Sequence, residues 1–299
     1  MKTAFKLKRP YLKGIVRSAL KEDIGKGDIT TELAIPIKRQ VKAVLLAKEH
    51  FLLCGLEIAS LAFELKDKRI KFRPLAQDGQ EIKKGRIFAR IEGAAVSILT
   101  AERVALNFLS FLSGIATKTR AYVEAVSPYR LKIMDTRKTI PGLRKLEKYA
   151  VRVGGGYNHR MGLDEMVLIK DNHIATLNQK AETSSKFQII NLRQTIEQIK
   201  KIKIKIEIEV KNLKEFKEAI KLKPDIIMLD NMSISDMKKA VRLRNALSAI
   251  GYRLSAKLEA SGGITLKNVR KIAATGVEMI SIGELTDSVD SADISLEVL

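Results

Sequence analysis

Cysteine and tryptophan are almost absent from this 299-residue sequence, which has one cysteine and no tryptophan. The single cysteine, Cys54, cannot form an intramolecular disulfide, so a disulfide-stabilised secreted scaffold is excluded and a reducing cytoplasm is expected. Cys54 lies in the apolar run FLLCGLEIA, with no base near it in the sequence. We interpret it as a buried, unreactive thiol.

Long apolar runs are also lacking. No stretch approaches the roughly 20 apolar residues that span a bilayer. Residues 44–63 come nearest, but Lys48, Glu49, His50 and Glu57 interrupt them. The basic N-terminus has no apolar core leading to a cleavage site of small residues, so we expect no signal peptide. The sequence thus predicts a cytoplasmic protein that does not contact a membrane.

Aromatic residues are few, whereas positive charge is abundant. The chain has six Tyr, nine Phe and a net charge of +21. A basic chain attracts the phosphates of nucleic acids. Here, however, the lysines are scattered beside Ile and Leu, as in residues 200–205, and no basic surface with interleaved aromatic rings stands out. We interpret the charge as solvated helix faces and expect no nucleic-acid partner, with a nucleic-acid-binding protein kept as an alternative.

Residues 1–113 mix strand and helix patterns, which predicts an N-terminal α+β sandwich domain. A long segment with helical periodicity begins at about Thr100, and we expect a break in this helix near Ser113-Gly114. The segments typical of strands are 41–47 and 87–91, and the segment typical of a shorter helix is 56–66.

Strand and helix patterns alternate from residue 114 to residue 286. Such repetition favours parallel strands that curve into a barrel. A complete eight-stranded barrel typically takes about 250 residues, so we predict an α/β fold with an incomplete barrel of six or seven strands. The tail 287–299 contains ISLEV, which we expect to return to the first domain as a strand. The candidate barrel strands are 132–134, 166–169, 206–210, 226–229, 257–260 and 279–282.

Charged residues directly follow the first two of these strands, in DTRK from Asp135 and in KDNH from Lys170. Charges at the end of a buried strand cost desolvation energy, and a barrel carries its ligand site at this edge. Guanidinium groups hold carboxylates and phosphates through two parallel hydrogen bonds. We therefore predict a cationic pocket for a small polyanion, formed by Arg137, Lys138, His159, Arg160 and Lys170.

Two carboxylates, Glu209 and Asp230, end neighbouring predicted strands. Near a phosphate-rich ligand, such a pair can hold Mg²⁺, usually through water, or accept hydrogen bonds from ribose hydroxyls. Strand alternation places Glu207 on the same side as Glu209, and we expect Glu207 to orient its neighbours. We expect no zinc site at His159 and His173, because cysteine ligands and a third histidine are absent nearby.

A phosphate-binding turn is predicted at Ser261-Gly262-Gly263, directly before the helix-like segment 265–276. Glycines let the backbone approach an anion closely, and the N–H groups at the start of a helix face it. Gly283 ends the next strand, and we assign it to the same phosphate subsite.

Longer motifs occur in a fixed order along the chain: EDIGKGDITTE, TAERVALNFLSFLSGIAT, DTRKT, PGLR-LEKYAV, GGG-NHR, LIKDNH and EASGGIT. Together they resemble the quinolinate phosphoribosyltransferase family over nearly the whole chain. The resemblance implies a type II phosphoribosyltransferase. Such an enzyme would convert quinolinate and 5-phosphoribosyl-1-pyrophosphate to nicotinate mononucleotide, pyrophosphate and CO₂ in de novo NAD biosynthesis.

The resemblance also implies roles for single residues. Lys138, Lys170, Glu209 and Asp230 would be catalytic, with Glu209 and Asp230 holding Mg²⁺ as the cofactor. The other residues of the cationic pocket and the phosphate turn would bind substrate. Arg103, on the long helix, would complete the pocket of a neighbouring subunit, so a homodimer or a hexamer is expected.

The chain departs from the family pattern at Asp287, where many members carry His. A carboxylate would repel phosphate there, so we expect Asp287 at the periphery of the site. Residues 177–188 resemble an enlarged loop of unknown purpose. A paralogue with the same fold, associated with molybdate transport and acting on another aromatic acid, is a second alternative. The intact cationic residues argue against it.

Overall fold

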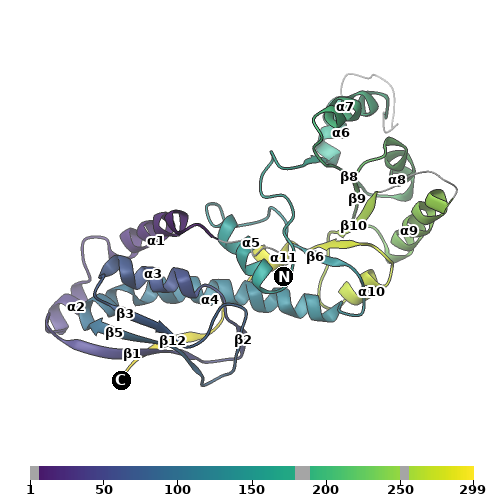
Figure 1. Ribbon diagram of the computed structural model, residues 1–299. Coiled ribbons are helices and arrows are strands. Elements are labelled where there is room, and N and C mark those ends of the chain that lie inside the picture. The colour runs from purple at the N-terminus through teal and green to yellow at the C-terminus, as the bar shows by residue number, and fades with distance from the viewer. Residues whose placement is uncertain (1–6, 179–188, 250–255) are drawn as a thin grey trace. The chain divides into compact units, whose positions relative to one another are not determined.

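The computed structural model describes residues 7–178, 189–249 and 256–299 (Figure 1). The chain forms two compact units. Unit 1 consists of residues 1–120, 139–156 and 284–299, and unit 2 consists of residues 121–138 and 157–283. The domain boundaries expected from the sequence, 1–113 and 114–286, stay a prediction, because this division follows spatial contacts and not chain order.

Unit 1 contains a four-stranded antiparallel sheet in the order β12-β1-β5-β3. The tail segment ISLEV forms β12 and pairs with β1, with Ala47 opposite Ile294, as its sequence predicts. The strands of unit 1 are β1 (Gln40–Ala47), β2 (Phe51–Leu52), β3 (Lys71–Pro74), β4 (Glu81–Ile82), β5 (Ile87–Ala94) and β12 (Ile294–Val298). Its helices are α1 (Arg9–Ile24), α2 (Ile29–Ala34), α3 (Leu56–Lys66), most of α4 (Ala95–Ala125), α5 (Arg144–Val153) and α11 (Glu284–Asp287).

The helix α4 runs unbroken through Ser113 and Gly114, so the expected break is wrong. The Ser113 hydroxyl accepts a hydrogen bond from the backbone N–H of Cys54 at 3.0 Å. A Cβ on Gly114 would lie 2.2 Å from the carbonyl oxygen of Asp290. The glycine therefore permits close packing against the tail, a tertiary reason that no local pattern reveals.

Burial explains two further features of unit 1. Cys54 is fully buried, and burial holds the pKa of its thiol well above the ordinary value, which agrees with an unreactive cysteine. By length and composition α4, and not residues 44–63, comes nearest to a membrane span. Half of its most apolar window is buried inside the structure, however, as in the core helix of a globular protein.

Unit 2 contains a six-stranded parallel sheet in the order β6-β11-β10-β9-β8-β7. The two edge strands, β6 and β7, do not pair with each other in the part of the chain that the structure describes. The prediction of an incomplete α/β barrel is thus confirmed. Its strands are β6 (Lys132–Met134), β7 (Val167–Ile169), β8 (Ile206–Val210), β9 (Ile226–Asp230), β10 (Lys257–Ser261) and β11 (Met279–Ser281).

Helices follow most of these strands before the next strand begins (Figure 1). They are α6 (Asp171–Asn178), α7 (Ile189–Lys201), α8 (Leu213–Ala219) with the short η1 (Ile220–Leu222), α9 (Ile234–Ala249) and α10 (Val269–Ala273). Of the proposed loop 177–188, Leu177 and Asn178 end α6, and the remainder lies outside the described residues.

All five residues of β8 are buried, although two of them are glutamates. The isoleucines and the valine of IEIEV alternate with Glu207 and Glu209, so both carboxylates lie on one face of the strand. A parallel strand covered on both faces is normally apolar throughout. The exception at β8 marks the face where the polar site is built.

Candidate active site

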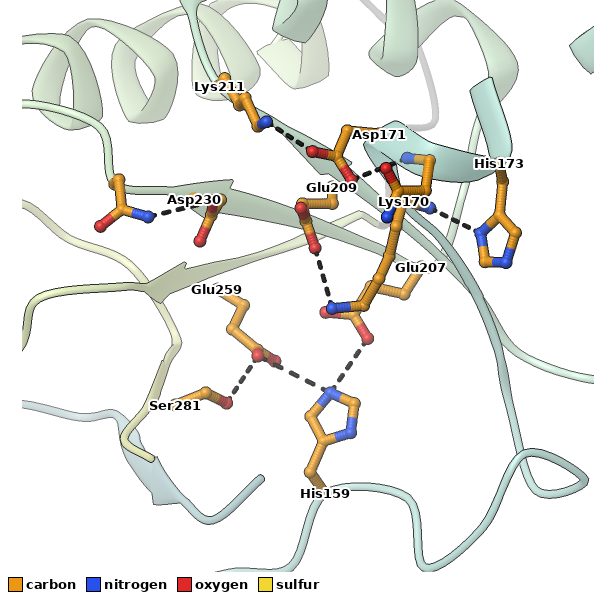
Figure 2. Close-up of polar contacts among 12 residues, drawn as sticks. His159, Lys170, Asp171, His173, Glu207, Glu209, Lys211, Asp230, Glu259 and Ser281 are labelled. Atoms are coloured by element: carbon orange, nitrogen blue, oxygen red, sulfur yellow. Dashed lines mark hydrogen bonds and ion pairs between the residues drawn. The ribbon is translucent and has the colours of Figure 1, made fainter. Parts of the chain in front are cut away.

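Polar residues converge at the carboxyl ends of the parallel strands of unit 2 (Figure 2). The register aligns Ser261 of β10 with Asp230 of β9 on one side and with Ser281 of β11 on the other. Lys170 follows β7 directly, and Glu209 is the fourth residue of β8. These side chains therefore share one edge of the sheet, where barrels bind ligands.

An ion pair joins Lys170 and Glu209 at this edge. The Lys170 Nζ lies 3.3 Å from Glu209 Oε2, and the carboxylate side chain is only 9% exposed. Burial raises the pKa of Glu209, the ammonium of Lys170 opposes this effect, and the negative charge of Asp230 adds to it. Two mutually repelling carboxylates beside a lysine are suited to a cation or to a ligand's hydroxyl groups.

A second ion pair lies at the same edge but in solvent. The Nζ atom of Lys211 is 2.6 Å from Asp171 Oδ2, and both side chains are about half exposed, at 51% and 49%. The ammonium of Lys211 lowers the pKa of Asp171. Because exposed pairs contribute little stability, this contact provides a matched control for the buried one.

The segment Asn158-His159-Arg160 is held by a buried carboxylate at the end of β6. Asp135 is fully buried, and its side chain accepts hydrogen bonds from Asn158 Nδ2 at 2.5 Å and from the backbone N–H of His159 at 2.8 Å. An isolated parallel bridge between Met134 and Tyr157 leads into this segment. The segment is therefore tied to the sheet although it forms no strand.

The ring of His159 turns inward, toward Glu207 and Glu259 (Figure 2). Its Nε2 atom lies 3.0 Å from Glu207 Oε2 and 3.7 Å from Glu259 Oε1, and the ring side chain is 7% exposed. Its Nδ1 atom accepts a hydrogen bond from the backbone N–H of Arg160 at 2.8 Å. His159 is therefore the neighbour that Glu207 contacts and can orient. Direct contact of His159 with substrate stays a prediction.

Glu259, which lies in β10, is a site residue that was not predicted from the sequence. Its carboxyl group is fully buried and accepts a hydrogen bond from the Ser281 hydroxyl at 2.6 Å. Burial and the neighbouring charge of Glu207 raise the pKa of Glu259 to about 8, and the hydrogen bond from Ser281 opposes the rise. A glutamate inside the apolar strand KLEAS, as in IEIEV, was the available sequence signal.

The charge of Arg137 acts on Arg160, another arginine of the predicted cationic pocket. Burial lowers the pKa of the Arg160 guanidinium, and the positive charge of Arg137 lowers it further. One arm of Arg160 is fixed, because its Nη1 donates to the carbonyl oxygen of Met166 at 2.8 Å. Lys138, next to Arg137, is exposed. Like charges held together in this way favour an anion that lies between them.

The predicted phosphate turn is a loop and not a helix start. The helix α10 begins only at Val269, so the expected helix from residue 265 is wrong over its first turn. The side chain of Asn268 accepts from the Thr265 N–H at 2.9 Å and donates to the Gly263 carbonyl at 2.9 Å, which keeps this stretch non-helical. Gly262 and Gly263 have φ values of +85° and +59°, a conformation that favours glycine.

Three further residues named from the sequence, Gly283, Arg103 and Asp287, have the following places in the fold. Gly283 follows β11 at the same edge of the sheet. Arg103 is exposed on α4 in unit 1, and its role in a neighbouring subunit stays a prediction. Asp287 is exposed at the end of α11, also in unit 1.

Arginines, lysines, carboxylates and a glycine turn lie at the carboxyl ends of the strands of a parallel α/β barrel, an arrangement typical of an enzyme that binds a charged ligand. Models of one family match nearly the whole chain: the quinolinate phosphoribosyl transferase N-terminal domain over residues 28–113 and the C-terminal domain over residues 115–297. The chain belongs to the quinolinate phosphoribosyltransferase family.

Individual relatives agree with this assignment. A probable nicotinate-nucleotide pyrophosphorylase (carboxylating) of Synechocystis is 42% identical over 94% of this chain and 90% of its own length. The corresponding Bacillus subtilis protein is 40% identical over 96% and 93%. The solved structure of the nicotinate-nucleotide pyrophosphorylase from Francisella tularensis superposes with a TM-score of 0.87, at 38% identity and full coverage of both chains.

Proposed function

We propose that this protein transfers the phosphoribosyl group of 5-phosphoribosyl-1-pyrophosphate to the ring nitrogen of quinolinate in NAD biosynthesis. The products are nicotinate mononucleotide, pyrophosphate and CO₂. The observation that carries the proposal is the gathering of charged side chains at the strand ends. Lys170 Nζ lies 3.3 Å from Glu209 Oε2, and the charge of Arg137 acts on the guanidinium of Arg160, an effect that a bound dicarboxylate would relieve. Family membership supplies the identity of that dicarboxylate.

The cationic residues bind quinolinate in this proposal. Arg137 and Arg160 hold the carboxylates through guanidinium forks, and Lys138 and Lys170 add positive charge at the same rim. His159 belongs to the binding segment, and its ring nitrogen Nδ1 accepts a hydrogen bond from the backbone N–H of Arg160. The arrangement orients the ring nitrogen toward the sugar.

Glu209 and Asp230 provide the cation site. Their carboxylate oxygens are the hard ligands that Mg²⁺ prefers. The charge of Asp230 raises the pKa of Glu209, which indicates that the two side chains lie near each other. These donors fit the cofactor that we predict. Bound Mg²⁺ would neutralise negative charge on the pyrophosphate group.

Ser261, Gly262, Gly263 and Gly283 hold the 5′-phosphate. Positive φ angles at the two consecutive glycines expose backbone to an anion at the strand ends. Because the helix start lies further along the chain, the loop itself and not a helix terminus provides these contacts.

Positioning and charge stabilisation account for the chemistry. The bond between the ribose C1′ and pyrophosphate breaks with its electron pair on pyrophosphate, and the ring nitrogen supplies the pair for the new bond. The carboxylate beside that nitrogen then leaves as CO₂, and the ring carbon takes up a proton. Fixed cations near developing charge lower such barriers. Lys138 and Lys170 are the ammonium groups that we assign to this task.

A homodimer completes the site in our proposal, with Arg103 reaching the pocket of the partner. Three large apolar residues near α2 support an interface, because Ile29, Leu33 and Ile37 are 73%, 84% and 83% exposed. Mixing Arg103→Ala with Arg137→Ala tests the arrangement. Subunit exchange should restore activity that neither variant has alone, and a mixture as inactive as its components would contradict shared sites. A hexamer would be built from such dimers.

We assign the reaction to the cytoplasm. Relatives are named chloroplastic in Arabidopsis thaliana and mitochondrial in Nicotiana tabacum, so location differs within the family. Fractionation of the source cells tests the assignment. Activity that sediments with membranes would contradict it.

Acceptor specificity tests the proposed function. The protein is mixed with 5-phosphoribosyl-1-pyrophosphate, Mg²⁺ and one acid at a time: quinolinate, nicotinate or another aromatic acid. We expect nicotinate mononucleotide from quinolinate and none from nicotinate. A nucleotide formed only with a different aromatic acid would favour the molybdate-associated alternative. Steeply salt-dependent binding of DNA without any turnover would favour the nucleic-acid alternative.

A further inference from the structure

The buried cluster around His159 has a defined arrangement of donors and acceptors. A neutral imidazole has one N–H donor and one acceptor nitrogen. The backbone N–H of Arg160 points at Nδ1 from 2.8 Å, so Nδ1 is the acceptor and the proton resides on Nε2. The Nε2–H group then donates to Glu207 Oε2 at 3.0 Å.

The tautomer of His159 shows whether this cluster is suited to a metal ion or to hydrogen bonds alone. Ligand atoms of His159, Glu207 and Glu259 all lie within 4.8 Å of one another, a spacing that would suit a metal ion. A metal bound at Nε2 needs the lone pair of that nitrogen and, on Nδ1, a proton donated to an acceptor. Here Nδ1 faces a donor instead, so the geometry favours a hydrogen-bonded cluster without metal.

The cluster is costly to bury. Glu207 and Glu259 are fully buried, and Glu207 Oε1 and Glu259 Oε2 have no hydrogen-bond partner among the described residues. Buried carboxyl groups with unsatisfied oxygens reduce stability, and apolar replacements of similar shape are often neutral or stabilising. Stability therefore does not explain these residues, whereas positioning does.

The cluster acts on the segment that carries Arg160. Asp135 holds Asn158 and the His159 backbone from one side, and Glu207 holds the His159 ring from the other. The ring nitrogen then accepts from the Arg160 N–H, while the Arg160 side chain is held by Met166. The backbone that presents this guanidinium is thus fixed on both sides.

We infer that Glu207 is a positioning residue, which keeps His159 in the neutral Nε2–H tautomer and thereby sets Arg160 for the carboxylate of the acceptor. Glu259 accepts a hydrogen bond from Ser281 and lies on the other side of the His159 ring nitrogen Nε2, at 3.7 Å. The inference deepens the proposed function and rests on it where Arg160 binds quinolinate. Glu207 acts through His159 and does not itself contact the substrate.

Two variants of Glu207 separate positioning from folding. Glu207→Gln keeps an oxygen that can accept from Nε2–H, so its KM for quinolinate should stay near that of the wild type. Glu207→Leu removes the acceptor and should raise this KM about tenfold or more. Its KM for 5-phosphoribosyl-1-pyrophosphate should stay near that of the wild type, and its melting temperature should not fall. Asp171→Leu, at an exposed carboxylate of the same edge, is the matched control and should leave both KM values unchanged.

Nitrogen NMR of the histidine rings reads the tautomer without any substrate. The chain has three histidines, so loss of one signal set in His159→Gln assigns the ring. We expect a protonated Nε2 and an unprotonated Nδ1 in the wild type and in Glu207→Gln, and a mixture of tautomers in Glu207→Leu.

Three outcomes would overturn the inference: an Nδ1–H tautomer in the wild type, a Zn²⁺ titration that shifts the His159 signals stoichiometrically, or wild-type kinetics in a well-folded Glu207→Leu. Absence of quinolinate turnover in the wild type is a different failure. It would remove the proposed function, and the expected tautomers in the three proteins would still support the positioning of the segment by Glu207.

Discussion

The ammonium of Lys170 lies 3.3 Å from the carboxylate of Glu209, so a residue that we assign to substrate is paired with one that we assign to Mg²⁺. The lysine side chain is 46% exposed and the glutamate side chain 9%. In the unliganded protein, the lysine offsets part of the cost of burying Glu209 beside Asp230. On ligand binding, the bound cation would become the partner of Glu209, and the anionic substrate would become the partner of Lys170.

Glu209→Gln should raise the Mg²⁺ concentration needed for half-maximal activity by about tenfold or more, because one of two carboxylate ligands is lost. Initial rates measured over a Mg²⁺ series, after removal of metal with a chelator, check this. Asp171→Asn changes a carboxylate at the same edge that pairs in solvent with Lys211, and it should leave the Mg²⁺ dependence unchanged. Identical curves for wild type and Glu209→Gln would remove Glu209 from the metal site.

Arg160→Lys should raise the KM for quinolinate by about tenfold while keeping the positive charge, since an ammonium cannot form the two parallel hydrogen bonds of a guanidinium. The control is Arg244→Lys, at an arginine of unit 2 that pairs with Glu278 at 2.7 Å. That change should lower stability slightly and leave the KM unaltered. Equal KM values for the two variants would contradict a specific role of Arg160.

Gly262→Ala should weaken binding of 5-phosphoribosyl-1-pyrophosphate. Its φ of +85° strains any other residue, and a Cβ would lie 2.3 Å from Asn231 Oδ1. Gly276→Ala has a similar strain, at φ +93°, but its Cβ would meet only a side-chain methyl of Val241 at 3.2 Å. The strained backbone should cost both variants about 1–2 kcal/mol of unfolding free energy, and the contact with Asn231 should cost Gly262→Ala more. Only Gly262→Ala should raise the KM for the phosphoribosyl donor in steady-state assays.

Glu259 should make stability fall as pH rises. Its pKa is about 8 in the folded protein against an ordinary 4.5, so between these values the folded state holds a proton that the unfolded state has lost. The associated stability is complete below the unfolded pKa and is lost as pH rises through the folded pKa. Chemical denaturation at several pH values should show this decline for the wild type and a smaller one for Glu259→Gln. Parallel profiles would assign the dependence to other groups.

The strands and the edge that carries the site could be predicted from the sequence. Short apolar runs ending in charged residues identified β6 and β7, and the register then aligned Asp230 with Ser261 as a parallel sheet requires. Parallel strands bring the residues at their carboxyl ends to one edge of the sheet, so the sequence alone indicated that Glu209 and Asp230 are neighbours.

The interior of the site could not be predicted in the same way. The contact of His159 with Glu207 joins segments 48 residues apart in sequence, and the tautomer depends on a backbone N–H of the next residue. Gly114 permits an approach to Asp290, which only the folded chain reveals. The late start of α10 follows from side-chain hydrogen bonds of Asn268 that compete with the helix.

Release of CO₂ from quinolinate labelled in the carboxylate beside its nitrogen is the most direct test of the assigned reaction. We expect one CO₂ for each nicotinate mononucleotide and each pyrophosphate formed by the wild type, with full dependence on 5-phosphoribosyl-1-pyrophosphate. Arg137→Ala should lose nearly all of the three products, and Arg244→Lys should retain them. Folded wild-type protein that releases no label, or that releases it without the phosphoribosyl donor, would contradict the assigned reaction.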